Sequence, residues 1–339
     1  MIAHVAGARE LAATPNGDLL VGTTGYDIYI VPNADGDPQP ARVFLSVPDP
    51  GAAGVALGAG SLYIGSHTGV WRVPYATGDR AASALAERIA SVRTIDERGH
   101  FTTSVAVAGN RLYASVGSSC NACVERDPTR ATILEMGLDG KDPHPKAVRI
   151  RNAIALAVDP ASEALWAGVA GQDELEHGHP YEIFDDVGAR PGTADYGWPA
   201  CFEDRRPVHA GTDCSAIAVP RVAFPAYETP IGAAFYPLSP SGPHAFAPAY
   251  RGGAFVALHG SWHIPLVPPR VVFVPMHGDE PATPVDWSNP AAQWQPFVTG
   301  FQDDDGRRIG RPTGVAVGAD GSLFVADDMA GVVYRIRPR

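Results

Sequence analysis

The stretch GVALGAGSLYIGSHTGVWRVP, residues 54–74, contains two short apolar segments joined by a glycine turn, and then a third that ends in proline. The same outline occurs six times, at residues 11–32, 54–74, 104–134, 154–184, 232–275 and 314–336. One such unit cannot bury both of its faces, whereas units stacked radially around a channel bury them and leave only short edges. The sequence therefore predicts an all-β, six-bladed β-propeller, with a β-sandwich of chance-similar hairpins as the alternative.

Composition and length agree with many short strands. The 339 residues include 37 glycines and 32 prolines, about a fifth of the chain against roughly 12% in average proteins. Length alone would suggest two domains. The repeats instead predict one propeller domain over residues 1–339, with a long inserted loop at about 186–230. Because long ordered loops on a rigid scaffold often carry binding residues, we expect this insertion to border a site.

The charge and the apolar pattern exclude two classes of partner. The net charge is −11, whereas nucleic-acid binding needs a basic face. No run of 18 apolar residues predicts a membrane span. Residues 1–6 lack the features of a signal peptide, so we expect either a cytoplasmic protein or a chain that begins after a removed leader. The composition suits a protein that handles small molecules.

The four cysteines form two local pairs, Cys120/Cys123 and Cys201/Cys214. Even, local pairing favours two disulfides and an oxidising compartment, so we expect a periplasmic or secreted protein, with the cytoplasm left open. Free thiols are the alternative. A redox or metal motif at Cys120/Cys123 is a second alternative, although zinc would usually need another such pair.

Several polar residues stand where the first strand of a unit begins or the second strand ends. In a propeller, such strand ends converge on the central channel. His100 precedes the third unit, and a histidine there is either a general base or a solvated loop residue. Arg151-Asn152 precedes a strand of the fourth unit, Arg311 one of the sixth, and His259 ends a strand of the fifth.

Arg151 and Arg311 are expected to meet across the channel mouth. Two arginines there would bind a planar polyanion through forked hydrogen bonds to carboxylates. Alternatively, each arginine pairs with a nearby acid such as Asp159 or Asp327. Both interpretations remain open from the sequence.

The loop at residues 171–176 contains Gln172, Asp173 and Glu174. Its carboxylates and carbonyls could supply oxygen ligands to Ca²⁺, although the spacing is not that of an EF-hand. A solvated acidic loop is the alternative. The chain has no Gly-x-Ser-x-Gly, no P-loop and no Gly-x-Gly-x-x-Gly that opens a helix, so serine-hydrolase and nicotinamide chemistry have no motif support.

Taken in order, segments from end to end resemble the pyrroloquinoline quinone (PQQ)-dependent sugar dehydrogenases, the soluble glucose dehydrogenase and L-sorbosone dehydrogenase-like group. The matching segments are residues 7–11 (GAREL), 100–103 (HFTT), 116–121 (VGSSCN), 130–133 (RATI), 151–153 (RNA), 196–199 (YGWP), 259–262 (HGSW) and 310–312 (GRP). Each is weak alone, and their order makes the resemblance specific.

The resemblance implies that a six-bladed propeller holds PQQ at the mouth of its channel. His100 would take the proton of a sugar's anomeric hydroxyl while hydride passes from the sugar C1 to the quinone C5. Arg151 would polarise the quinone oxygens, with Asn152 beside it, and Arg311 would bind a PQQ carboxylate. His259 falls near the position of a cofactor-binding lysine.

The resemblance also implies a Ca²⁺ ion that bridges PQQ to the chain near Asp173 and Glu174, and we count Gln172 as cofactor-binding. An external electron acceptor would follow. The expected substrate is an aldose or sugar aldehyde.

The chain departs from the family pattern at Gln172, at Glu176-His177, at Tyr227-Glu228 and at His263-Ile264. These departures motivate a second hypothesis, a non-redox propeller that binds a carbohydrate or a partner. A metal-dependent lactonase ranks last, because no clear set of acids and asparagines stands at the inner strand starts.

Overall fold

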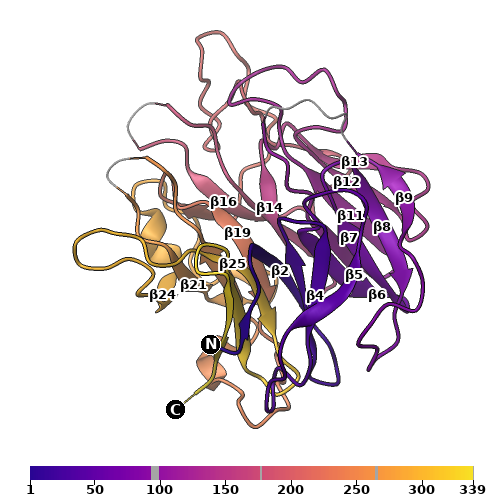
Figure 1. Ribbon diagram of the computed structural model, residues 1–339. Helices are drawn as coiled ribbons and strands as arrows, with labels where there is room; N and C mark the ends of the chain where they lie inside the picture. Colours follow the sequence, from indigo (N-terminus) through magenta and orange to yellow (C-terminus); the bar gives the residue numbers. More distant parts are fainter. Residues whose placement is uncertain (93–98, 176–177, 264–265, 339) are drawn as a thin grey trace.

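The computed structural model describes residues 1–92, 99–175, 178–263 and 266–338, and it confirms the six-bladed β-propeller (Figure 1). Five antiparallel sheets follow the chain from inner to outer strand: β2 (Ala8–Ala13), β3 (Leu19–Thr23), β4 (Asp27–Val31) and β5 (Arg42–Ser46); β6 (Gly54–Gly58), β7 (Ser61–Gly65), β8 (Gly69–Pro74) and β9 (Glu87–Ser91); β10 (Val105–Ala108), β11 (Arg111–Val116), β12 (Thr132–Gly137) and β13 (His144–Val148); β14 (Ala153–Val158), β15 (Leu165–Val169), β16 (Glu182–Asp186) and β18 (Val222–Phe224); β19 (Pro230–Phe235), β20 (Ala254–Leu258), β21 (Arg270–Val274) and β24 (Gln295–Val298).

The sixth blade joins the two ends of the chain. It consists of β25 (Pro312–Val317), β26 (Leu323–Asp327), β27 (Val332–Ile336) and β1 (Ala3–His4), and β1 pairs antiparallel with β27. The N-terminal strand thereby closes the ring, and the two termini lie side by side in Figure 1. The six inner strands contact one another in a closed circle.

Each blade has a fourth, outer strand that the repeat outline did not contain. The outer strand β18 is buried throughout, but the other outer strands are largely exposed or half-buried, and β9 has no buried residue. Such a strand carries few apolar residues, so hydrophobic periodicity does not reveal it. The core instead lies between blades, where Trp166 packs against Phe184 and Phe235 with ring centroids 5.0 and 5.6 Å apart.

The inner strands crowd near the axis, as their small residues predict. A Cβ atom on Gly314 of β25 would lie 2.2 Å from the carbonyl oxygen of Arg9 on β2, so only glycine fits there. A cavity on the axis is lined by residues of all six inner strands, and Glu10 is the one ionisable group among them. Its Oε1 makes no hydrogen bond within the described part of the chain.

The insertion at about 186–230 adds strands to two blades. β17 (Ala194–Asp195) pairs parallel with β13 and makes the third blade five-stranded, and β18 is the outer strand of the fourth blade. The remaining regular elements are β22 (Met276–His277), β23 (Glu280–Pro281) and the 3₁₀ segments η1 (Pro248–Tyr250) and η2 (Pro290–Gln293).

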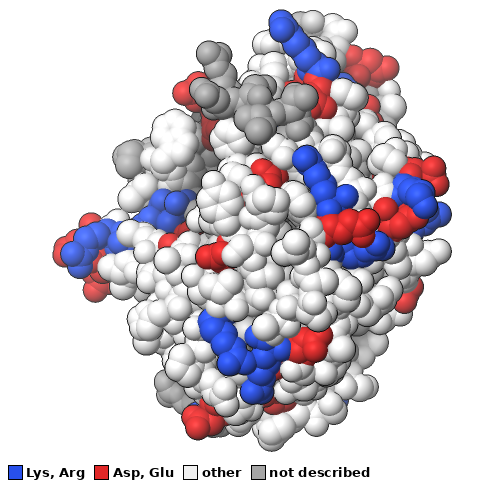
Figure 2. Space-filling view, turned by 45° about the vertical axis from the view of Figure 1, so that its right-hand side comes forward, with Lys and Arg blue, Asp and Glu red and all other residues white. Residues whose placement is uncertain are grey.

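The surface carries mixed charge. On the face shown in Figure 2, basic and acidic side chains lie next to each other and do not form a continuous basic patch. Ion pairs such as Arg72–Glu87, at 2.8 Å, are typical of this arrangement. In the described ranges, no helix is long and apolar enough to cross a membrane.

Candidate functional site

The predicted site residues gather on one face of the propeller. Inner and second strands are antiparallel, so the start of one and the end of the other lie at the same edge of each blade. The residues at these positions are His100, Arg151, Asn152 and Arg311 before inner strands, Arg9 near the start of β2, and His259 and Asp328 after second strands.

His100 is held in one tautomer by Ser118. Its Nδ1 lies 3.2 Å from the Ser118 carbonyl oxygen and 3.0 Å from the Ser118 Oγ. That hydroxyl gives its only proton to the Cys120 carbonyl oxygen, at 2.8 Å. A carbonyl oxygen only accepts, so Nδ1 carries the hydrogen. Nε2 is then the basic nitrogen of the neutral ring, as a general base requires.

Gly117 lets His100 and Asn152 approach each other. A Cβ atom on Gly117 would lie 2.5 Å from the His100 Cβ and 2.6 Å from the Asn152 Oδ1. Asn152 is buried, and its Oδ1 has no hydrogen-bond partner among the described residues. A buried oxygen without a partner costs about 1–3 kcal/mol, a cost that a bound water or a ligand donor would remove.

Arg151 is buried, and all five of its N–H groups have acceptors within the protein. Nε donates to the Asn121 carbonyl oxygen at 3.1 Å. Nη1 donates to the carbonyl oxygens of Ala170, at 3.4 Å, and Gly171. Nη2 donates to the Asn121 Oδ1 at 3.0 Å and to the Asp173 Oδ2 at 2.8 Å. The partner acid is therefore Asp173 and not Asp159.

The saturation of Arg151 limits what it can do to a bound molecule. Its guanidinium has no N–H group left to donate, so it acts on a ligand through its positive charge. A direct hydrogen bond would require the ligand to replace one of the present acceptors, of which the Asp173 carboxylate is the half-exposed one.

Part of the loop predicted to bind Ca²⁺ is already engaged by N–H donors of the protein. The Asp173 carboxylate lies 2.8 Å from the Arg151 Nη2 and 3.7 Å from the His263 Nε2. Its carbonyl oxygen accepts from the Asn121 Nδ2 at 3.0 Å, and the Gly171 carbonyl accepts from Arg151. Glu174 is exposed. N–H donors thus occupy the Asp173 Oδ2 and two carbonyl oxygens of the loop, whereas no hydrogen bond recorded among the described residues uses the Asp173 Oδ1 or the Glu174 carboxylate.

Gln172 lies in the same loop. It borders a hollow together with Arg151, Tyr181 and Trp198. No hydrogen bond recorded among the described residues uses its side chain.

A second cluster on the same face is basic. The Arg9 Nη1 lies 2.9 Å from the Asp328 Oδ2. Arg311 donates from Nε to the His259 carbonyl oxygen at 3.3 Å and from Nη2 to the Gly260 carbonyl oxygen at 2.9 Å. Burial lowers the pKa of Arg311, the carboxylate of Asp328 opposes this shift, and the charges of Arg308 and Arg9 lower the pKa further. Three arginines thus gather around Asp328, and a carboxylate ligand would add to the charge compensation that Asp328 provides.

His259 is an uncharged member of this cluster. Its Nε2 lies 3.1 Å from the Asp328 Oδ1, yet burial lowers its pKa to about 4. The ring is therefore neutral at pH 7 and donates one hydrogen bond to Asp328. The His259 ring therefore does not supply the positive charge that a lysine would supply at this position. In this cluster that charge comes from Arg9, which pairs with the same Asp328.

Arg151 and Arg311 belong to separate networks. Arg151 contacts loops of the third and fourth blades, and Arg311 contacts the loop after β20 of the fifth. No recorded hydrogen bond or ion pair among the described residues joins the two. The backbone N–H of Arg311 donates to Asp327 at 2.9 Å, whereas its side chain is directed to His259 and Gly260.

Sequence reasoning missed residues that support the predicted ones. They are Arg9, Ser118, Asn121, Arg308 and Asp328. Arg9 belongs to the first unit, to which no site residue had been assigned. Its position near the start of an inner strand, equivalent to those of Arg151 and Arg311, was the available signal.

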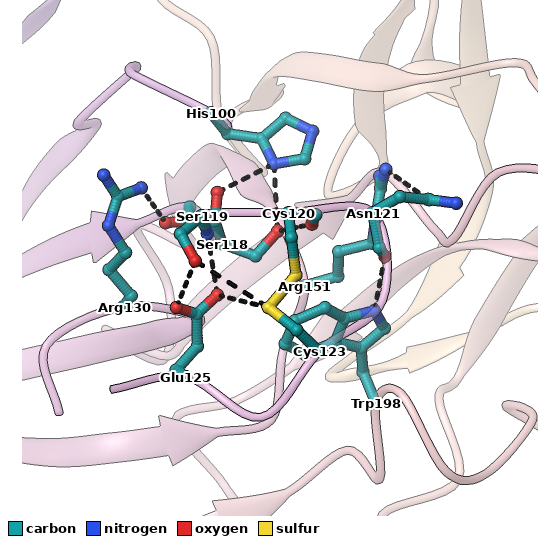
Figure 3. The surroundings of a disulfide bond; sticks show 11 residues. His100, Ser118, Ser119, Cys120, Asn121, Cys123, Glu125, Arg130, Arg151 and Trp198 are labelled. Atoms are coloured by element: carbon teal, nitrogen blue, oxygen red, sulfur yellow. Dashed lines mark hydrogen bonds between the residues drawn. A yellow bond between two sulfur atoms is a disulfide. The ribbon is translucent and has the colours of Figure 1, made fainter. Parts of the chain in front are cut away.

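Both predicted disulfides are present. Cys120–Cys123 spans three residues in the loop after β11, and Cys201–Cys214 closes part of the insertion. Figure 3 shows the first disulfide with His100 on one side of its loop and Trp198 on the other. The Trp198 Nε1 donates to the Asn121 carbonyl oxygen at 3.1 Å, so the insertion contacts the loop that carries Ser118 and Asn121. Glu125 lies close to both sulfurs, but in a disulfide these are not metal ligands.

Three rings stack at the rim of the site. His263 lies 3.6 Å from Tyr227 and 3.9 Å from Trp262, measured between ring centroids. The Trp262 side chain is two-thirds exposed. The family departures at Glu176-His177 and Ile264 lie outside the described residues.

Comparison with known proteins gives partial sequence matches. A family model described as TrAA12-like matches residues 204–339. An uncharacterized protein of Borreliella burgdorferi (strain ATCC 35210 / DSM 4680 / CIP 102532 / B31) is 25% identical over 232 residues, which cover 67% of this chain and 57% of that protein. The chain thus spans little more than half of that relative.

Solved structures match over nearly the whole chain. The holo form of the pyranose dehydrogenase PQQ domain from Coprinopsis cinerea has a TM-score of 0.82 at 19% identity, covering 98% of this chain and 93% of that one. The calcium structure of the Trichoderma reesei family AA12 enzyme has a TM-score of 0.78 at 19% identity, with 98% and 92% covered. The PQQ-bound aldose sugar dehydrogenase of Streptomyces coelicolor has a TM-score of 0.67 at 20% identity, with 97% and 91% covered.

The structural neighbours are thus PQQ-dependent sugar dehydrogenases and related sugar-active proteins, as the resemblance of the sequence predicted. At these identities the likeness establishes that this chain has the six-bladed propeller fold of those proteins.

Proposed function

We propose that this protein is a PQQ-dependent oxidoreductase that acts on the anomeric carbon of an aldose or on a sugar aldehyde. The observation that carries the proposal is the tautomer of His100, which leaves Nε2 as a base on the face where the arginines converge. The structural neighbours with PQQ in their descriptions support the choice of cofactor.

The residues present fit a planar tricarboxylate. Arg311 and Arg9, with Arg308 nearby, offer positive charge to carboxylates. The Asn152 Oδ1 beside His100, which has no partner among the described residues, offers an acceptor to a sugar hydroxyl or a ring N–H. Arg151 adds positive charge from its buried position. When bound, PQQ would accept the hydride from the sugar C1, and an external electron acceptor would reoxidise it.

The protein would carry out the proton chemistry. The Nε2 of His100 takes the proton of the anomeric hydroxyl as the C1–H bond breaks, so that the sugar loses one proton and one hydride and becomes a lactone. Ser118 keeps the ring oriented and stabilises the imidazolium through the Nδ1 hydrogen bond. A Ca²⁺ ion near Asp173 would have to share the carboxylate of that residue with Arg151.

A non-redox carbohydrate-binding propeller is the second candidate. The observation that favours it is the saturation of Arg151, which leaves this arginine no N–H group for a cofactor. Such a protein would bind sugar without PQQ.

One experiment separates the two functions. Purified protein is titrated with PQQ, with and without Ca²⁺, by calorimetry and absorbance, and dye reduction is then assayed with a panel of aldoses. We expect PQQ binding and sugar-dependent dye reduction. Sugar binding without PQQ binding or dye reduction would support the second candidate, and the Ca²⁺ arm tests whether a cation displaces Arg151 from Asp173.

An oxidising location, periplasmic or secreted, remains a prediction that agrees with the two disulfides.

A further inference from the structure

One short loop anchors both the base and the buried arginine. Residues 117–125 follow β11 and carry Ser118, which orients His100, and Asn121, which binds Arg151. These contacts come from opposite sides of the loop in Figure 3. Any change in the conformation of this loop would therefore alter the positions of both His100 and Arg151.

Asn121 makes more contacts with the site than any other residue of this loop. Its carbonyl oxygen accepts from the Arg151 Nε and the Trp198 Nε1, both at 3.1 Å. Its Oδ1 accepts from the Arg151 Nη2 at 3.0 Å and from the Asp173 backbone N–H at 2.8 Å. Its Nδ2 donates to the Asp173 carbonyl oxygen at 3.0 Å. Asn121 thus fixes both the guanidinium and the acid that pairs with it.

The loop is closed by covalent and polar links rather than by burial. The Cys120–Cys123 disulfide encloses Asn121 in a ring, and Glu125 accepts from the Ser119 backbone N–H and Oγ, each at 2.7 Å. Both cysteines are half-buried, and Val124 is 88% exposed. With so little apolar packing, the disulfide and the hydrogen bonds of the loop are what constrain where Asn121 points.

We infer that Asn121 is a positioning residue of the site, which sets the direction of the Arg151 guanidinium and is itself held in place by the Cys120–Cys123 ring. The effect on cofactor binding rests on the proposed function, whereas the effect on Arg151 does not. Reduction of this disulfide would then loosen Arg151 and weaken the site, so the ring makes the site sensitive to thiol reductants.

The first test follows Arg151 itself and needs no cofactor. The Nε–H signal of Arg151 in a ¹H–¹⁵N spectrum is assigned as the one lost in R151K, and its hydrogen exchange is measured. We expect about ten-fold faster exchange in N121A and in C120S/C123S. The first variant removes the side chain that binds Arg151, and the second removes the ring that holds this side chain in place. The controls are N110A, at the exposed turn between β10 and β11, and V124A, beside the ring.

The second test separates positioning from a general loss of structure. N121D keeps the Oδ1 acceptor for Arg151 and Asp173, so we expect its Arg151 exchange and PQQ affinity to lie nearer to wild type than those of N121A. N121A should bind PQQ about ten-fold more weakly, with thermal unfolding of the cofactor-free protein within a few degrees of wild type. If N121A does not fold, C120S/C123S carries the same test.

The outcomes distinguish the two proposals. Arg151 exchange in N121A and C120S/C123S equal to that in wild type overturns the positioning role, whatever happens with PQQ. Wild-type protein that binds no PQQ overturns the proposed function. In that case, faster Arg151 exchange in the variants would still support the positioning role of Asn121.

Discussion

His100 and Ser118 are joined twice, because the Nδ1 of the ring lies within hydrogen-bonding distance of both the carbonyl oxygen and the hydroxyl of the same serine. Residues 18 positions apart in the chain thus define a single tautomer, with Nε2 as the proton acceptor. A substitution that removes the His100 ring but keeps a hydrogen bond to Ser118 should therefore remove the base with little other change to the site.

Replacing His100 with glutamine removes the base and keeps a side chain that can bond Ser118. We expect sugar-dependent dye reduction to fall by about 10²–10⁴, the range that general-base catalysis contributes. The measurement is steady-state kinetics of the PQQ-loaded protein. S118A is the companion variant, and it should retain more activity because the carbonyl contact remains. Activity in H100Q equal to that of wild type would remove His100 from the mechanism.

Arg311 should be needed for binding of the cofactor. R311A removes a charge-assisted contact to a carboxylate, so we expect PQQ affinity to fall about ten- to hundred-fold, measured by calorimetry. R307A is the matched control, since Arg307 lies on the same loop but is exposed and paired with Asp303 at 3.0 Å. Equal losses in the two variants would show that Arg311 acts only through the general charge of the face.

Glu10 in the axial cavity should make stability depend on pH. Burial raises its pKa from 4.5 to about 8, while Ser104, Arg9 and the Val55 N–H oppose the shift. Between pH 4.5 and about pH 8, the Glu10 carboxyl keeps its proton in the folded state but has lost it in the unfolded state. Stability from this group is therefore present below pH 4.5 and is lost as the pH rises through about 8.

The variant E10Q cannot titrate. We expect the free energy of unfolding of wild type to fall more steeply from pH 5 to pH 8 than that of E10Q, by up to about 1.4 kcal/mol per pH unit. Denaturant unfolding at several pH values measures this difference. E87Q, on the exposed outer strand β9, serves as the control and should keep the wild-type slope. Parallel curves for E10Q and wild type would mean that Glu10 is ionised in the fold.

The Cys201–Cys214 disulfide should stabilise the insertion. Both cysteines are buried and pack against Ile217. Closing a loop of this size is worth about 3 kcal/mol, so C201S/C214S should unfold at a lower denaturant concentration by a corresponding amount. Guanidinium titration monitors the change. An unchanged midpoint would show that the insertion unfolds separately from the blades.

The sequence alone determined the repeat, and with it the fold. The apolar segments of strands such as β7 and β20 are buried between blades, so their pattern had to be regular and could be read directly. The same is true of the two cysteine pairs, whose partners lie close along the chain. Placing His100, Arg151 and Arg311 on one face followed from strand ends alone.

The tertiary structure decided how those residues are used. Arg151 reaches Asp173 and Asn121, and Arg9 reaches Asp328, 319 positions away. Contacts between loops of different blades leave no periodic signal, because each loop is free to vary in length while the strands are not. The sequence therefore gives the positions of the charged residues, and only the folded chain shows which donors are already occupied by its own acceptors.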